Sequence, residues 1–164
     1  GGGLCQLANL IHYLVLHSPL EVSVLHHHTA ALFPDVRRRV PFGTGTSVFF
    51  PHIDYRFTNR TAQPVQLRVW LSDGDLCGEL RACQPFPLRY RLAEEGHCFV
   101  WEEDGWYRVS RVYRRAFDRS DGSLVENRLI LDNHSRVLYD PSLIPPDEIA
   151  VTRPGETEGS HAVG

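Results

Sequence analysis

At 164 residues, the chain has the length of one ordinary domain and can bury a hydrophobic core without disulfide support. Its 17 basic and 20 acidic residues give a formal net charge of −3, so charge points neither to a nucleic-acid partner nor to an anionic membrane surface. No hydrophobic run reaches the roughly 18 residues that a membrane-spanning helix requires.

The sequence contains no methionine, although a natural translation product normally begins with one. We therefore expect a piece of a longer protein, with further residues of the same fold upstream. A signal peptide or an anchor would lie in that upstream part, so these residues alone do not indicate the compartment.

Apolar residues recur at helical spacing near the beginning of the chain. Leu4, Leu7, Ile11 and Leu14 fall on one face, which predicts a helix over residues 4–18 that packs on a core. Pro19 is expected to end it, because proline lacks the N–H that a helix interior needs.

A strand and a long loop are expected next. The run LEVSVLHHHT alternates apolar and polar residues as a strand does, and FPDVRRRVPFGTGT then carries the prolines and glycines of an irregular connection. A loop of this length is a candidate lid or rim. Its GTGT element is glycine-rich but lacks the lysine that a phosphate-binding loop would supply.

From residue 47 onwards the pattern indicates β-structure. Residues 47–59, 64–72 and 76–83 predict a three-stranded antiparallel meander, with a turn at the Asp-Gly of SDGDL. Five further runs follow: 88–94, 97–103, 105–118, 123–133 and 135–140. The predicted fold class is α+β, with one N-terminal helix packed on seven or eight mostly antiparallel strands and a second half that is an all-β meander.

Three regions follow from this pattern. Residues 1–84 form the core with the helix, residues 85–144 form a β-rich extension packed on it, and residues 145–164 form a polar tail rich in proline and glycine. We expect the tail to be disordered, because it offers too little apolar surface to compensate for the entropy of ordering.

Cys5 is a candidate nucleophile. A helix N-terminus favours the thiolate, and the glycines before Cys5 would let backbone N–H groups of Gly2 and Gly3 approach a substrate carbonyl as an oxyanion hole. The alternative is a small buried residue at the start of an ordinary helix. The remaining cysteines, Cys77, Cys83 and Cys98, are expected to be small apolar residues rather than disulfide or zinc ligands.

A cysteine nucleophile needs a base, and a histidine cluster follows the predicted helix. Strand alternation places His26 and His28 on one face and His27 on the other. The pair could act as base or orient a substrate, could hold a metal together with Cys5 or Asp54, or could simply be exposed. Asp54, among apolar positions, is expected to orient a histidine or to bind an arginine.

Several segments in order resemble the VanW family. They are GGGLCQLANLIHYLVLHSPLEV, HHHTAALFPD, VPFGTGTSVFFPHIDYRFTNRTAQPVQLRVWL and the closing NHSRVLYDP, which together cover residues 1 to about 141. Members of that family typically carry a glycine-rich element ending in Cys-Gln, a His-x-His element, and a glycine-containing loop that leads into a strand with a central aspartate.

The resemblance implies a bacterial cell-envelope protein linked to peptidoglycan, in which some members act as cysteine L,D-transpeptidases. It places Cys5 as the nucleophile, His26 and His28 as the histidines of the His-x-His element, and Asp54 as the strand aspartate. Gln6, in the Cys-Gln element, would contact the substrate. The implied partner is a peptidoglycan stem peptide, and no cofactor is expected.

Two further features leave alternatives open. Arg37 and Arg38, in the run RRR, could bind carboxylates of a stem peptide through paired hydrogen bonds, or could belong to a solvated loop. The whole chain could be a cysteine acyl transferase, or a non-catalytic module associated with glycopeptide resistance that recognises the same peptides.

Overall fold

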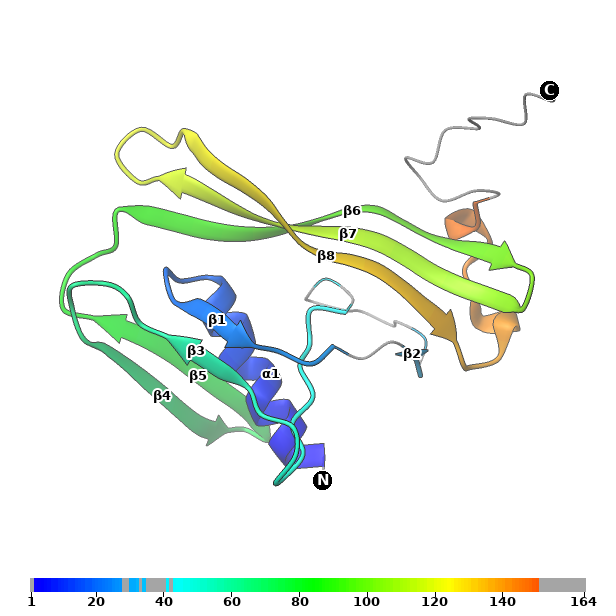
Figure 1. The fold of residues 1–164 in the computed structure, drawn as a ribbon, viewed down its shortest axis with the longest axis horizontal. Coiled ribbons are helices and arrows are strands. Elements are labelled where there is room, and N and C mark those ends of the chain that lie inside the picture. Colours follow the sequence, from blue (N-terminus) through cyan, green and yellow to red (C-terminus); the bar gives the residue numbers. More distant parts are fainter. Residues whose placement is uncertain (1, 28–29, 33, 35–40, 42, 151–164) are drawn as a thin grey trace.

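The computed structural model describes residues 2–27, 30–32, 34, 41 and 43–150. Within them the chain forms one α-helix, eight strands and two short 3-10 helices (Figure 1). These are α1 (Gly2–Leu16), β1 (Glu21–Val24), β2 (Ala30–Ala31), β3 (Arg56–Thr58), β4 (Val65–Ser72), β5 (Asp75–Ala82), β6 (Leu88–Glu102), β7 (Gly105–Asp118), β8 (Leu124–Val137), η1 (Pro141–Leu143) and η2 (Pro146–Glu148). The described part is mostly β with one helix, consistent with the predicted α+β class.

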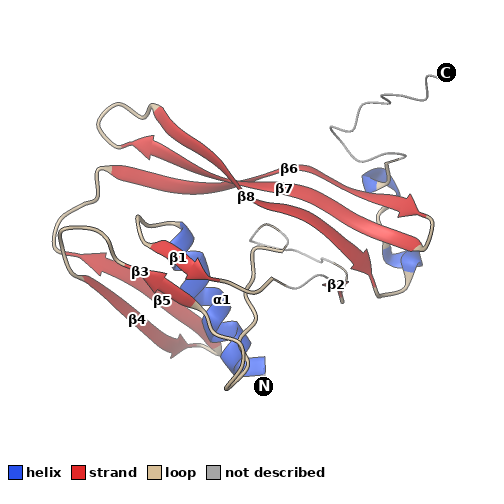
Figure 2. Cartoon of the chain, in the orientation of Figure 1, coloured by secondary structure: helices blue, strands red, loops and turns tan. Residues whose placement is uncertain are grey.

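The molecule has two parts that lie one above the other in Figure 2. The long strands β6, β7 and β8 form an antiparallel meander, and α1 lies below it together with the short strands β1, β3, β4 and β5. The meander predicted for the second half is therefore confirmed. Its outer strand β8 also pairs with β2 in parallel, Ala30 opposite Arg136, which the sequence pattern did not predict.

Two of the long strands were predicted as pairs of shorter ones. β6 continues through Gly96, where the chain has a φ of 63° and the register with β7 shifts between Glu95 and Cys98. The glycine therefore makes a β-bulge instead of the predicted turn. β8 likewise runs without interruption past His134, because each of its residues from 131 to 136 faces a partner on β7.

The predicted three-stranded meander of the first half is wrong. β4 and β5 form a hairpin closed at Asp73 and Gly74, both with positive φ, as the Asp-Gly pair predicts. β3, however, pairs with β1. The physical reason lies in the connection from β3 to β4, where the Asn59 side chain donates to the Gln63 carbonyl at 2.8 Å and closes a polar loop instead of a hairpin turn.

Residues 47–55 do not form the predicted strand. The Phe49 carbonyl accepts hydrogen bonds from the N–H groups of His52 at 2.7 Å and Ile53 at 2.8 Å, which closes a tight turn around Pro51. The proline has no N–H to contribute to a strand ladder, so only Arg56–Thr58 of this run pairs as a strand.

Buried residues gather where α1 packs against the long sheet and against the short strands. Val15 and Leu16 of α1 are buried, as are Val112 and Ala116 of β7, whereas Val109 of β7 packs in a cluster with Cys98 and Val100 of β6. On the other side of the helix, Gly78 of β5 lets the backbone approach closely, because a Cβ there would lie 3.0 Å from Leu10 and 3.1 Å from Leu14.

The end of the chain departs from the prediction of a tail beginning at residue 145. The N–H of Ala150 donates to the Phe99 carbonyl of β6 at 2.8 Å, Ile149 bridges to Phe99, and Ile144 is buried. Residues 145–150 are therefore attached to the long sheet. The predicted disorder of residues 151–164 concerns positions outside the described residues. None of the helices in the described residues is both long enough and apolar enough to cross a membrane.

Candidate functional site

Residues 43–48 run along one face of α1 and hold its first turns. The Cys5 thiol donates to the Val48 carbonyl at 3.8 Å, and the Thr46 N–H donates to Asn9 Oδ1 at 2.7 Å. Gly45 faces the same asparagine, and a Cβ there would lie 3.0 Å from its Oδ1. We call residues 43–48 the helix strap. The GTGT element thus serves close packing against the helix.

The helix strap also contacts the long sheet through Gly43. This residue has a φ of 76°, and a Cβ there would lie 2.8 Å from Leu131 Cδ2 of β8. The backbone conformation favours glycine at this position, and a side chain there would make the end of Leu131 shift. The strap is therefore fixed between α1 and β8.

Replacing Gly43 with alanine is expected to lower the free energy of unfolding by about 2 kcal/mol, because the left-handed backbone is strained and the neighbouring Leu131 and Asn133 side chains must shift. Gly122→Ala is the matched control. Gly122 has a φ of 75° but no atom within 4 Å of the added Cβ, so it should cost only about 1 kcal/mol. Urea denaturation of both variants measures the difference, and equal losses would show that the strap is not tightly packed at Gly43.

Cys5 lies in the first turn of α1, partly exposed. Gly2 and Gly3 were predicted to precede the helix, but they belong to it. The change has a chemical consequence, since the first N–H groups of a helix have no carbonyl partner within it and stay available to an external acceptor. Gln6 follows on the helix and is exposed.

An apolar cavity of about 320 Å³ opens beside the Cys5 turn. It lies between the first turns of α1 and the turn around Pro51. Its walls also include Asp54 and Tyr55. Its other lining residues are Leu4, Leu7, Ala8, Ile11, Val48, Phe49, Phe50, Ile53 and Phe57.

The structure brings the histidine segment to the helix strap, and through it close to Cys5. The Ser47 N–H donates to the His26 carbonyl at 2.8 Å, and His27 Nδ1 lies 3.0 Å from the Gly43 carbonyl. The His26 side chain is exposed. Among the described residues, no hydrogen bond joins the Cys5 thiol to an imidazole. His28, Arg37 and Arg38 lie outside the described residues.

Asp54 binds an arginine, one of the two roles expected for it. Its Oδ2 lies 2.6 Å from Arg56 Nη2, and both side chains are exposed. Asp54 does not lie in the strand predicted for it, because the chain turns at Pro51 and the strand begins only at Arg56.

His12 is a feature that the sequence analysis missed. Its side chain is 2% exposed, and its Nδ1 lies 3.0 Å from the Tyr55 hydroxyl. Burial, with a smaller contribution from the nearby His27, lowers the pKa of His12 to about 4, and burial raises the pKa of Tyr55. The helical spacing could have indicated its burial, because His12 shares a helix face with the buried Ala8 and Val15.

The free energy of unfolding is expected to fall as the pH drops from about 6.5 to about 4. In that window the unfolded chain protonates His12 while the folded chain keeps it neutral, so protons favour unfolding. The loss should approach about 3 kcal/mol at pH 4. Comparing urea denaturation of the native protein and His12→Gln across this range isolates the contribution. His17→Gln is the control, because His17 makes an exposed hydrogen bond to the Tyr13 carbonyl. Its unfolding free energy should depend on pH as that of the native protein does.

No disulfide joins Cys5, Cys77, Cys83 and Cys98, all of which lie in the described residues. The described part of the chain contains no group of three His, Cys, Asp or Glu side chains placed to hold a metal ion.

Comparison with known proteins gives two matches. The family model described as VanW like protein matches residues 1–81. The Vancomycin B-type resistance protein VanW of Enterococcus faecalis (strain ATCC 700802 / V583) is 27% identical over 139 residues, which cover 85% of this chain and 50% of that protein. The chain thus spans about half the length of the curated relative it matches. No solved structure matches.

Proposed function

Because residues 1–81 belong to the VanW-like family, we propose that this chain is part of a bacterial cell-envelope protein that acts on peptidoglycan stem peptides through Cys5. The single observation that supports the proposal most is the place of Cys5. Its thiol lies partly exposed in the first turn of α1, and the helix strap joins that turn to the backbone of His26.

The proposed reaction is an acyl transfer. The Cys5 thiolate attacks the carbonyl carbon of the third residue of the stem peptide, and the amide C–N bond to the fourth residue then breaks with release of this terminal D-residue. The leaving amine takes its proton from the base, and a thioester remains on Sγ. An acceptor amine attacks this thioester and gives a proton to the base, the new amide forms, and the thiolate leaves, so that thiolate and protonated base are restored. No cofactor takes part.

Each remaining candidate has a proposed role. His26 or His28 acts as the base, since both belong to the segment after β1 in which the His26 carbonyl accepts a hydrogen bond from the helix strap. The N–H groups of Gly2 and Gly3 stabilise the oxyanion, because helix N–H groups at the first turn lack internal partners. Asp54 is engaged by Arg56, so we do not assign it to orient a histidine. Gln6, Arg37 and Arg38 contact the substrate.

A second candidate is a non-catalytic module associated with glycopeptide resistance. Two observations favour it: the relative bears the name of a resistance protein, and the thiol partner of Cys5 among the described residues is a carbonyl instead of an imidazole. Such a module would bind stem peptides without cleaving them.

Exchange of the terminal residue separates the two candidates. The full-length protein is incubated with a tetrapeptide stem that ends in a D-residue and with an isotopically labelled D-amino acid, and the products are followed by mass spectrometry. The acyl transferase releases the original D-residue and incorporates the label. Binding of the tetrapeptide with no incorporation would contradict the enzyme and support the module.

A further inference from the structure

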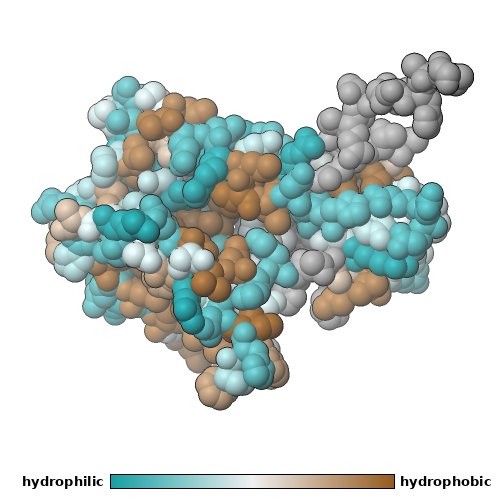
Figure 3. Space-filling model, in the orientation of Figure 1, coloured by the Kyte–Doolittle hydropathy of each residue, from teal (hydrophilic) through white to brown (hydrophobic). Residues whose placement is uncertain are grey.

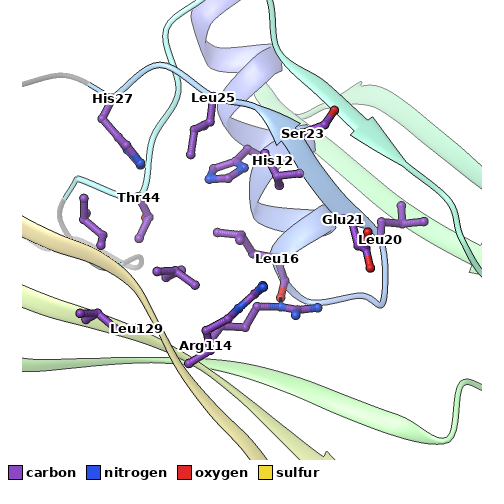
Figure 4. A pocket seen from close by; sticks show the side chains of 14 residues that line it. His12, Leu16, Leu20, Glu21, Ser23, Leu25, His27, Thr44, Arg114 and Leu129 are labelled. Carbon is purple, nitrogen blue, oxygen red and sulfur yellow. Dashed lines mark hydrogen bonds between the residues drawn. The ribbon is translucent and has the colours of Figure 1, made fainter.

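A second cavity, of about 520 Å³, lies between the two parts of the molecule (Figure 4). Residues of α1 and β1 form its upper wall, and residues of β7 and β8 form its floor. Cys5 is not among its lining residues, so this cavity is separate from the proposed reaction centre. Its volume falls in the range that holds a small ligand.

Two arginines meet on the floor of this cavity. Arg114 of β7 and Arg128 of β8 stand directly opposite each other in the antiparallel register, and both line the cavity. Side chains directly opposite on neighbouring strands share one face, and like charges placed so are destabilising. A ligand with negative charge would remove this repulsion.

The carboxylates nearby leave positive charge in the cavity. Glu21 also lines it, but its Oε2 lies 2.7 Å from Arg60 Nε and is thereby engaged. Glu126 Oε2 lies 3.9 Å from Arg114 Nη1, a long and partly exposed contact. Arg128 is exposed and has no hydrogen bond or ion pair with any residue in the described ranges. Its guanidinium is therefore available to an external anion.

The rest of the wall mixes polar side chains with a group of leucines, isoleucine and valine. Figure 4 shows Leu16 and Leu25 on the side of α1 and β1, and Leu129 with Arg114 on the side of the long sheet. In the space-filling view, hydrophobic surface also lies in the middle of this face, between the long sheet and the part that carries α1 (Figure 3). A ligand that matches both features carries an anionic group on an apolar body.

We propose that this cavity binds the free C-terminal carboxylate of a short, largely apolar peptide, with Arg128 as the principal partner of the carboxylate. Arginine binds a carboxylate through two parallel hydrogen bonds, which suits a terminal carboxylate better than a single negative point charge. Arg114 adds its charge from the opposite strand. The inference does not require Cys5 to be a nucleophile, so each proposal can fail without the other.

Calorimetric titration of the full-length protein tests this site. The probes are an N-acetylated alanyl-leucine dipeptide with a free carboxylate, the same dipeptide as its C-terminal amide, and inorganic phosphate. The acid should bind, the amide should bind at least about tenfold more weakly, and phosphate, which lacks an apolar body, should also be weaker than the acid. Equal affinity for acid and amide, or no binding of the acid, would overturn the proposal.

Variants locate the site. Arg128→Gln should weaken binding of the acid about tenfold and leave the weak binding of the amide unchanged. The matched control is Arg119→Gln, which removes the same charge from the exposed turn after β7, away from the cavity. Circular dichroism shows that both variants fold. Native affinity in Arg128→Gln, or an equal loss in Arg119→Gln, would refute the assignment.

Discussion

Replacing Cys5 with alanine is expected to lower the rate of D-amino-acid exchange by at least about a thousandfold, because the acyl intermediate cannot form without the sulfur. The substitution removes one hydrogen bond, from the thiol to the Val48 carbonyl, in a partly exposed position. We therefore expect the fold to persist. The measurement is the initial rate of label incorporation into the tetrapeptide by the full-length protein.

The matched control for this variant is Cys83→Ala. Cys83 is an exposed free thiol after the end of β5. Its removal should leave the rate unchanged. If Cys5→Ala retains the native exchange rate, the chemistry does not pass through this sulfur.

Replacing Arg114 with alanine is expected to cost about 3 kcal/mol of unfolding free energy or more. Its buried guanidinium donates to the Leu16 carbonyl at 2.9 Å and also to the Ser18 carbonyl, at the end of α1. It also lies over the Tyr90 ring, 3.9 Å from the centroid. The arginine therefore fastens the end of the helix to the long sheet. Without it, carbonyl groups at a buried helix end lose their partner.

Urea denaturation measures this loss, with two variants for comparison. Arg114→Lys keeps the charge, but a lysine ammonium cannot reach both carbonyl groups as the planar guanidinium does. It should therefore recover only part of the stability. Arg119→Ala removes an exposed arginine and should change the unfolding free energy by less than about 0.5 kcal/mol. Equal stability of Arg114→Ala and the native protein would mean that the helix end does not depend on the sheet.

Local patterns predicted the elements whose signals lie within one segment. The apolar spacing identified the helix, and the Asp-Gly pair at residues 73–74 identified the β4–β5 hairpin. The alternation of the second half predicted the β6–β7–β8 meander. In each case the information needed is held by residues close together in the chain.

Pairings that depend on distant residues were not predictable in the same way. β3 pairs with β1, from which it is separated by the histidine segment and the helix strap, and β2 joins β8 in parallel. Gly96 also illustrates the limit, because the same residue type makes a turn or a bulge depending on whether the neighbouring strand continues beside it.

The candidate site shows the same division. The glycine-rich start of the helix was enough to predict Cys5 as a candidate. The helix strap could not be predicted, because the contacts of Asn9 and Gly45 arise only when α1 meets a segment some 35 residues away. Arg114 could not be recognised either. Its role depends on carbonyl groups at the end of α1, 98 residues earlier in the chain.

Trapping the acyl intermediate tests the central claim most directly. The full-length protein is mixed with the tetrapeptide stem in the absence of an acceptor amine, quenched in acid, digested and analysed by mass spectrometry. We predict a thioester on Cys5 that carries the stem peptide without its terminal D-residue. Release of that residue with the acyl group on another side chain, or with Cys5 unmodified throughout, would contradict the account.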